Sequence, residues 1–258
     1  MPRLPRRLRH GEEATLVEHL GELRARLVIS LVSVVITFGA AFAFQHRLID
    51  WLRSPLPKEH RELLTLSPTE PFFTALKVSF YAGLAIALPI VLWQLWSFLA
   101  PAFEEHAQRI VASFVAFGTA LFAAGVAFGY FLVLPAALRF LTNYDEALFN
   151  IQIRAKEYFT FATLTLFAIG LGFELPIFIL ALVRLGILSS RRLRSTRRAG
   201  IVIVVAVAVL LPTVDPVSLI FEAVPLLALY EGSIWLAVFF ERRWEKAGVL
   251  SWRTSWAE

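Results

Sequence analysis

One apolar run strongly limits what this chain can fold into. Residues 158–183 read YFTFATLTLFAIGLGFELPIFILALV and contain a single charged residue, Glu174. About 20 apolar residues in a helix cross the hydrocarbon core of a bilayer, so this run predicts a transmembrane helix. A carboxylate at that depth costs roughly 2.5 kcal/mol or more and normally faces protein or water. Glu174 is therefore either an acid that locks helices together or a functional polar site.

The remainder of the chain has the same character. Of its 258 residues, 58% are hydrophobic, and the mean hydropathy is +0.67, values typical of multi-span membrane proteins. We predict an all-α integral membrane protein, one domain over 1–258. The apolar runs predict six helices, over 27–44, 72–99, 110–138, 158–183, 199–214 and 218–240.

Basic residues are unevenly divided among the intervening segments. Segments 1–26, 100–109, 184–198 and 241–258 hold 6, 1, 6 and 4 Lys and Arg residues, 17 of the 25 in the chain. Cytoplasmic loops attract this excess, so we expect both termini in the cytoplasm, with 241–258 as a short polar tail. The cluster in 184–198 indicates topology and anionic lipid headgroups rather than nucleic-acid binding.

The last two predicted helices are short. Residues 201–211 are only 11 apolar residues, roughly 17 Å of helix, and Asp215 follows between two prolines. The final run is interrupted by Glu222 and Glu231. We expect either local thinning of the bilayer or tertiary packing that shields these acids.

Two segments outside the spans carry recognisable signals. The loop 45–71 contains four prolines, Pro55 among them, and is expected to form a short cap on the outer face. Residues 15–27, TLVEHLGELRARL, begin with a capping box and have a leucine stripe. They predict an amphipathic helix at the cytoplasmic surface that runs into the first span. Glu22 there is either a functional carboxylate or a surface partner of Arg26. The N-terminal arginines precede Glu12 and Glu13, so we expect no cleaved targeting sequence.

Several stretches in order resemble the TatC family, the multi-span core of the twin-arginine protein translocase. They are HLGELRARL (19–27), PFFTALKVSFYAGLAIALPIVLWQLWSFLAPAF (71–103), FGYFLVLPAALRFL (128–141), GLGFELPI (170–177) and VPLLALYE (224–231). The resemblance covers nearly the whole chain. It implies a concave six-helix bundle with both termini inside, located in the bacterial cytoplasmic (inner) membrane.

The resemblance also implies a function. Such a protein is the receptor that binds twin-arginine signal peptides of folded proteins for export driven by the proton-motive force. TatB-like and TatA-like single-span proteins would be its partners, within a complex that holds several copies of the chain. The implied signal-peptide site comprises Glu22, Arg24, Phe98 and Arg109, with Pro101 and Pro55 as structural residues. Glu174 and Asp215 match the family's intramembrane acid and the acid of its last outer turn.

This sequence departs from the family pattern at one important place. The family's second signal-binding glutamate falls at Ala107, and a commonly expected arginine falls at Gln108. Two guanidinium groups need more than one carboxylate for strong bidentate pairing. We therefore expect Glu104 or Glu105 to replace the missing partner. In addition, Glu222 stands where the family is apolar.

Two other classes of function are open to a chain of this composition. A proton-coupled transporter of small solutes could use Glu174, Glu222 and Glu231 as an intramembrane relay, although no internal repeat supports it. A membrane enzyme is not expected, because all five histidines lie outside the predicted spans and no HExxH, GxSxG or P-loop motif occurs. No metal or cofactor is expected, and the chain has no cysteine.

Overall fold

In the computed structural model of the chain, residues 16–99, 107–144, 151–185, 187–209 and 216–246 are described. These residues are almost entirely helical, which confirms the predicted all-α class. Five helical stretches are long and apolar enough to cross a membrane. The elements in order are α1 (Leu16–Ala43), α2 (Gln45–Arg53), the 3₁₀ turn η1 (Lys58–His60), α3 (Glu70–Leu99), α4 (Ala107–Phe128), the π turn η3 (Gly129–Val133), α5 (Leu134–Asn143), α6 (Ala155–Phe173), α7 (Leu175–Arg184), α8 (Ser190–Ser195), α9 (Arg197–Val209) and α10 (Pro216–Lys246).

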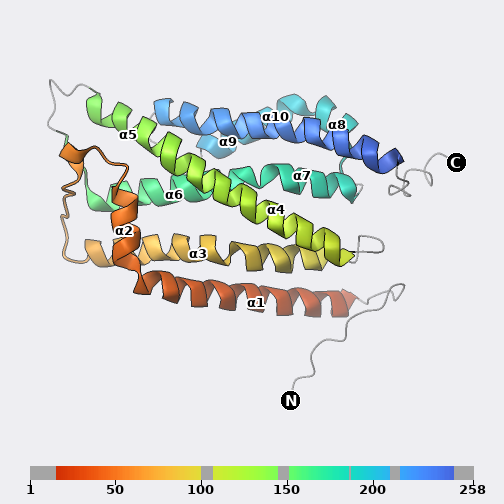
Figure 1. The fold of residues 1–258 in the computed structure, drawn as a ribbon, viewed down its shortest axis with the longest axis horizontal. Coiled ribbons are helices and arrows are strands. Elements are labelled where there is room, and N and C mark those ends of the chain that lie inside the picture. The colour runs from red at the N-terminus through yellow and green to blue at the C-terminus, as the bar shows by residue number, and fades with distance from the viewer. Residues whose placement is uncertain (1–15, 100–106, 145–150, 186, 210–215, 247–258) are drawn as a thin grey trace, which may run out of the picture.

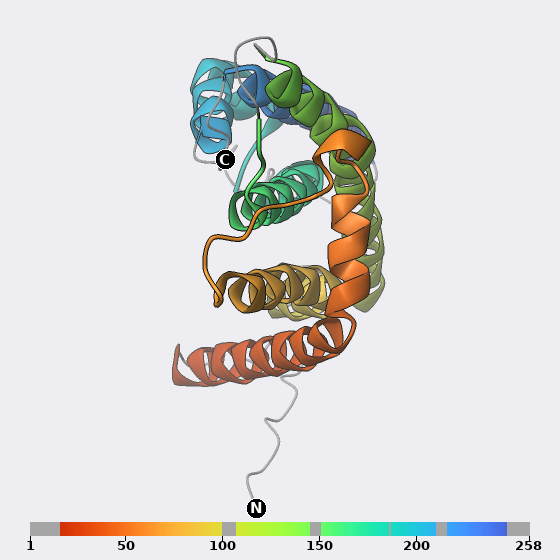
Figure 2. The same ribbon diagram turned by 90° about the vertical axis from the view of Figure 1, so that its left-hand side faces the viewer.

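The long helices run between two ends of the bundle (Figure 1). One end of the bundle holds the start of α1, the helix α8 and the end of α10. We call it the basic end. α2 and the starts of α3 and α6 lie at the other, which we call the cap end. Viewed along the helices (Figure 2), α1 and the α9–α10 pair project from a wall that includes α2 and α4, so the outline is concave.

α1 and α3 pack closely along their lengths. The helix predicted over 15–27 and the first predicted span form one continuous helix of 28 residues, α1. Gly83 of α3 lies against the backbone of α1, where a Cβ at Gly83 would be 2.6 Å from Phe38 Cα. Thr37 Oγ1 donates to the Gly83 carbonyl at 2.8 Å. This contact brings the start of α1 beside the end of α3.

Prolines interrupt two of the predicted spans. Pro135 stands at the second position of α5, and the chain takes the π turn η3 immediately before it, where Leu134 N donates to Gly129 O. Pro176 likewise stands at the second position of α7, directly after the break at Glu174. Since proline has no N–H and its ring clashes with the preceding turn, both breaks follow from the sequence.

The final hairpin differs from the prediction. Within the described residues α9 has 13 residues, about 20 Å of helix. The prediction that the last helix is also short is wrong, because α10 continues for 31 residues. Its two acids do not interrupt it: Glu222 is buried against α6, and Glu231 pairs with Arg197 of α9. Tertiary packing therefore shields the acids, one of the two expected outcomes.

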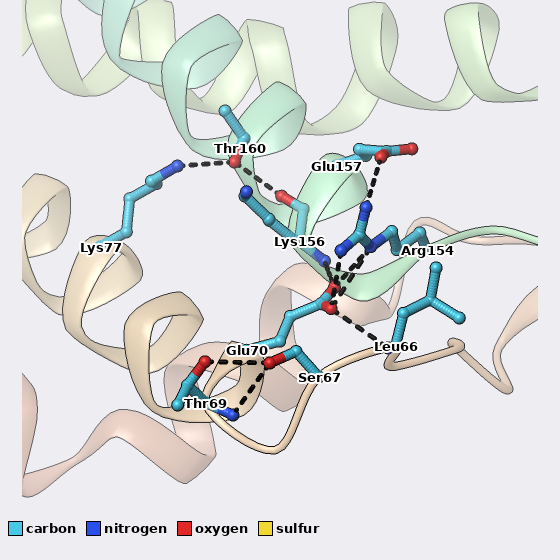
Figure 3. A network of polar contacts seen from close by, with 9 residues as sticks. All are labelled: Leu66, Ser67, Thr69, Glu70, Lys77, Arg154, Lys156, Glu157 and Thr160. Atoms are coloured by element: carbon cyan, nitrogen blue, oxygen red, sulfur yellow. Dashed lines mark hydrogen bonds and ion pairs between the residues drawn. The ribbon is translucent and has the colours of Figure 1, made fainter.

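The cap end is fastened by polar contacts between distant segments. Tyr130 donates to the Trp51 carbonyl at 2.9 Å and stacks on the Trp51 ring, which holds α2 on the bundle. Leu64 forms a parallel bridge with Arg154. Beside it, the Glu70 carboxylate of α3 accepts from Arg154 at 3.1 Å (Figure 3). The hydrogen bond to Glu70 raises the pKa of the Arg154 guanidinium. The loop 45–71 thus forms the short cap that its prolines predict.

Candidate functional site

Glu22 lies at the basic end on the first turns of α1. Arg26, one turn later, donates from Nε to Glu22 Oε1 at 3.1 Å, and its Nη1 reaches the Gln94 carbonyl of α3 at 3.4 Å. The Glu22 side chain retains 25% of its exposure. Both hydrogen bonds from Arg26 go to Oε1, and among the described residues Oε2 accepts none. An ionised carboxylate can accept about four hydrogen bonds, so Glu22 has capacity for further donors.

An aromatic stack joins α1 to α3 beside this carboxylate. The rings of His19 and Phe98 are stacked, with centroids 4.4 Å apart and planes inclined by 24°. Phe98 is half-buried, and Arg24 is exposed on the other side of α1 from the core. The structure therefore brings Glu22 and Phe98 to the same end of two packed helices. The sequence predicts His19 on one helix face with Glu22 and Arg26, whereas its contact with Phe98 depends on the packing of α1 against α3.

The other residues predicted for this surface belong to the segment between α3 and α4. Pro101, Glu104 and Glu105 lie outside the described residues. α4 begins at Ala107, so Arg109 stands in its first turn, although its side chain is not among those described. The prediction that Glu104 or Glu105 substitutes for the carboxylate absent at Ala107 stays a prediction.

Glu174 occupies the break between α6 and α7. Its backbone stays helical, and its N–H donates to Leu171 O at 3.0 Å. The side chain is only 1% exposed, so the carboxylate faces the protein and not the surface of the bundle. Gly118 of α4 lies directly opposite, next to Leu92 of α3.

The Glu174 carboxylate has unusual surroundings for a charged group. Neither oxygen has a hydrogen-bond partner among the described residues. We expected water or polar groups of other spans around it; Gly118 of α4 lies against the carboxylate, and the Leu92 side chain of α3 lies beside Gly118. An acid without partners in a low-dielectric interior favours its neutral form or a polar group supplied from outside.

Glu222 connects α10 to α6. It is 1% exposed, and Thr165 Oγ1 donates to its Oε1 at 3.0 Å. Seven residues after Thr165, Gly172 allows α10 to approach, because a Cβ there would be 2.1 Å from the Leu226 side chain. Thr165 and Gly172 together seat α10 on the helix that carries Glu174.

Glu231 lies nearer the basic end of α10 and pairs with Arg197 at the start of α9. Glu231 is therefore an ion-pair partner, while Glu174 has no hydrogen bond among the described residues. The relay of three acids that the transporter hypothesis requires stays a prediction.

Two further predicted positions, Pro55 and Asp215, remain. Pro55 lies in the turn after α2, next to Leu56, which is buried. Asp215 lies outside the described residues. Sequence reasoning missed two buried acids, Glu70 and Glu241. Glu70 ends the capping-box pattern SPTE (67–70), which could have identified it, whereas Glu241 accepts from Ser190 N of α8 at 2.8 Å and has no local signal.

The sequence of this chain is similar to that of known proteins over most of its length. The sequence model of the family "Sec-independent protein translocase protein (TatC)" matches residues 18–225. The chain is 37% identical over 226 residues to the chloroplastic Sec-independent protein translocase protein TATC of Arabidopsis thaliana, covering 87% of this chain and 66% of that relative. It is 38% identical over 233 residues to the TatC protein of Aquifex aeolicus, covering 88% and 96%.

The fold also matches solved structures. A crystal structure described as the twin arginine translocase receptor TatC superposes with a TM-score of 0.78 at 36% identity, covering 86% of this chain and 98% of that one. A second, in DDM, gives a TM-score of 0.79 at 37% identity. The chain thus matches bacterial relatives over nearly their full length, and spans about two thirds of the chloroplast protein.

Proposed function

Because this chain belongs to the TatC family of Sec-independent protein translocase proteins, we propose that it is the receptor and core subunit of a twin-arginine translocase. In this role it binds the signal peptides of folded proteins and supports their export, driven by the proton-motive force, across the bacterial cytoplasmic membrane. The role is one of protein transport, without a catalytic step.

The observation that carries this proposal is the Glu22 carboxylate. It stands on α1 at the basic end, partly exposed, with one oxygen bonded by Arg26 and the other free of hydrogen bonds among the described residues. Guanidinium groups bind carboxylates through charge-assisted, often bidentate hydrogen bonds. An arginine of a signal peptide can therefore pair with Glu22 by using Oε2 or by displacing Arg26, whose i,i+4 pair is weak.

The remaining parts of the site follow from the chain's neighbouring segments. Phe98, stacked on His19, offers an apolar surface beside Glu22. Glu104 or Glu105 supplies the second carboxylate, with Arg24 and Arg109 flanking the acids and Pro101 shaping the loop. These assignments extend the family resemblance to positions of this sequence.

We assign six spans with both termini in the cytoplasm, α9 being the short fifth span. The excess of Lys and Arg in 1–26, 184–198 and 241–258 supports this orientation. The start of α1 and the end of α10 also lie at the same end of the bundle (Figure 1).

The concave bundle would work within a larger complex. We propose TatA-like and TatB-like single-span proteins as partners, together with further copies of this chain. Glu174 is the polar site inside the membrane, since its carboxylate lacks a partner among the described residues. Asp215 and Pro55 are assigned to the outer side.

A peptide pull-down tests the receptor function. A twin-arginine signal peptide on resin should retain the purified protein, whereas a twin-lysine version should not, because an ammonium cannot make the bidentate pair. Glu22→Gln should lose retention on the twin-arginine resin. Equal retention by both peptides would contradict the proposal.

A further inference from the structure

A pocket at the cap end carries more positive charge than its own residues neutralise. It lies between the start of α3 and the start of α6 and has a volume of about 240 Å³. Three of its lining residues are basic, Lys77, Arg154 and Lys156, and one is acidic, Glu70. Because the cap end is opposite to Glu22, this pocket is separate from the proposed signal-peptide site.

The acid of the pocket is already fully engaged. Glu70 Oε1 accepts from Arg154 Nε and from the Lys156 N–H, both at 3.1 Å. Its Oε2 accepts from Leu66 N at 3.1 Å and from Arg154 Nη2 at 3.2 Å. The same guanidinium also pairs with Glu157, whose Oε1 lies 3.3 Å from Arg154 Nη1. The network of three basic and two acidic residues therefore keeps a net positive charge.

The two lysines lie on the Thr160 side of the Glu70–Arg154 pair (Figure 3). Lys77 Nζ donates to Thr160 Oγ1 at 2.8 Å, which uses one of its three protons. Neither Lys77 nor Lys156 forms an ion pair within the part of the chain that the structure describes. Thr74, a lining residue that is 6% exposed, has a hydroxyl without a hydrogen-bond partner among the same residues.

From these contacts we propose that the pocket binds a phosphate group, held by Lys77 and Lys156 with the Thr74 hydroxyl as a further donor, and that a phospholipid headgroup supplies it. Two ammonium groups that form no ion pair among the described residues, together with an unused hydroxyl, are suited to an anion with several acceptor oxygens.

The setting of the pocket identifies the source of the phosphate. The pocket opens at the end of candidate spans, where headgroups lie. Phe72 and Phe73 at the start of α3 are 55% and 62% exposed, and Leu66 is 71% exposed. Aromatic side chains are enriched at this level of a membrane. Exposed apolar groups beside the basic pocket offer a contact for acyl chains that free phosphate lacks.

Lipid binding to delipidated protein in neutral detergent, measured by native mass spectrometry, tests the proposal. Phosphatidylglycerol should bind, and diacylglycerol with the same chains should not. The double variant Lys77→Gln/Lys156→Gln should bind phosphatidylglycerol about tenfold more weakly or worse. The control Arg47→Gln/Lys58→Gln removes the same charge from exposed residues at the cap end and should bind like the parent. Lys77→Arg/Lys156→Arg should keep binding, which separates lost charge from lost folding.

Two results would overturn this inference. Equal phosphatidylglycerol affinities of the parent and Lys77→Gln/Lys156→Gln would remove the pocket as the site. Displacement of bound phosphatidylglycerol by millimolar inorganic phosphate would show that free phosphate is the ligand. Neither result bears on peptide binding at Glu22, so the two proposals fail separately.

Discussion

Gly118 of α4 lies against the carboxylate of Glu174: a Cβ at position 118 would be 2.8 Å from Glu174 Oε2 and 3.1 Å from Leu92 Cδ1. The space that the buried acid occupies therefore exists because α4 has no side chain at this point. Pro176, at the second position of α7, fixes the helix break at Glu174.

Gly118→Ala is expected to destabilise the protein by about 1–3 kcal/mol, because the added methyl overpacks the site. Thermal unfolding in detergent measures this. Gly39→Ala in α1 is the matched control: a Cβ at Gly39 meets nothing within 4 Å, so it should be neutral or stabilising by up to about 1 kcal/mol. Combining Gly118→Ala with Glu174→Ala should recover part of the loss. Identical effects of the two glycine substitutions would show that Gly118 does not confine Glu174.

Thr165→Val is expected to destabilise the protein by about 0.5–2 kcal/mol, because it removes the hydroxyl that donates to buried Glu222. Thr165→Ser keeps the donor and should cost less. Urea or thermal unfolding of the two variants provides the comparison. If valine is tolerated as well as serine, the hydrogen bond between α6 and α10 contributes no stability.

Much of the fold could be predicted because apolar run length and proline are local signals. The runs located the long helices of the described residues but not α2 or α8, and Pro176 and Pro135 mark the two breaks. The length of α10 was not predicted, because Glu222 and Glu231 interrupt an apolar run if the only surroundings considered are lipid. Their partners, Thr165 and Arg197, are 57 and 34 residues away, and only the folded chain brings them together.

The candidate site residues were singled out in two ways. Glu174 stands out because a carboxylate is unusual in an apolar run, whereas Glu22 was identified by the family resemblance. The lack of a partner for Glu174 depends on the packing of α3 and α4, which no local pattern reports. The Glu70–Arg154 pair joins residues far apart in sequence, so only the SPTE motif hinted at it.

Reporter fusions test the topology. Fusions near His60, Asn150 and Asp215 should report an external location, and a fusion near Arg192 a cytoplasmic one, because Lys and Arg gather in 1–26 and 184–198. A cytoplasmic location at Asn150 would refute the assignment of the third and fourth spans.

Glu104→Gln/Glu105→Gln should weaken binding of a twin-arginine peptide, since Glu22 alone cannot pair strongly with two guanidinium groups. Adding Ala107→Glu to this double variant should restore binding, because it places a carboxylate where the family has one. Peptide affinity by fluorescence anisotropy measures both effects. Unchanged affinity in the double variant would show that this chain reads the arginines without these loop acids.

The receptor claim is tested most directly by crosslinking a photoreactive twin-arginine signal peptide to the protein in membranes. We predict strong crosslinking to the parent and to Glu62→Lys, which makes the same charge change at an exposed residue of the cap end. Glu22→Lys should abolish crosslinking, because an ammonium in place of the carboxylate repels the incoming arginines. Full crosslinking by Glu22→Lys would contradict the account.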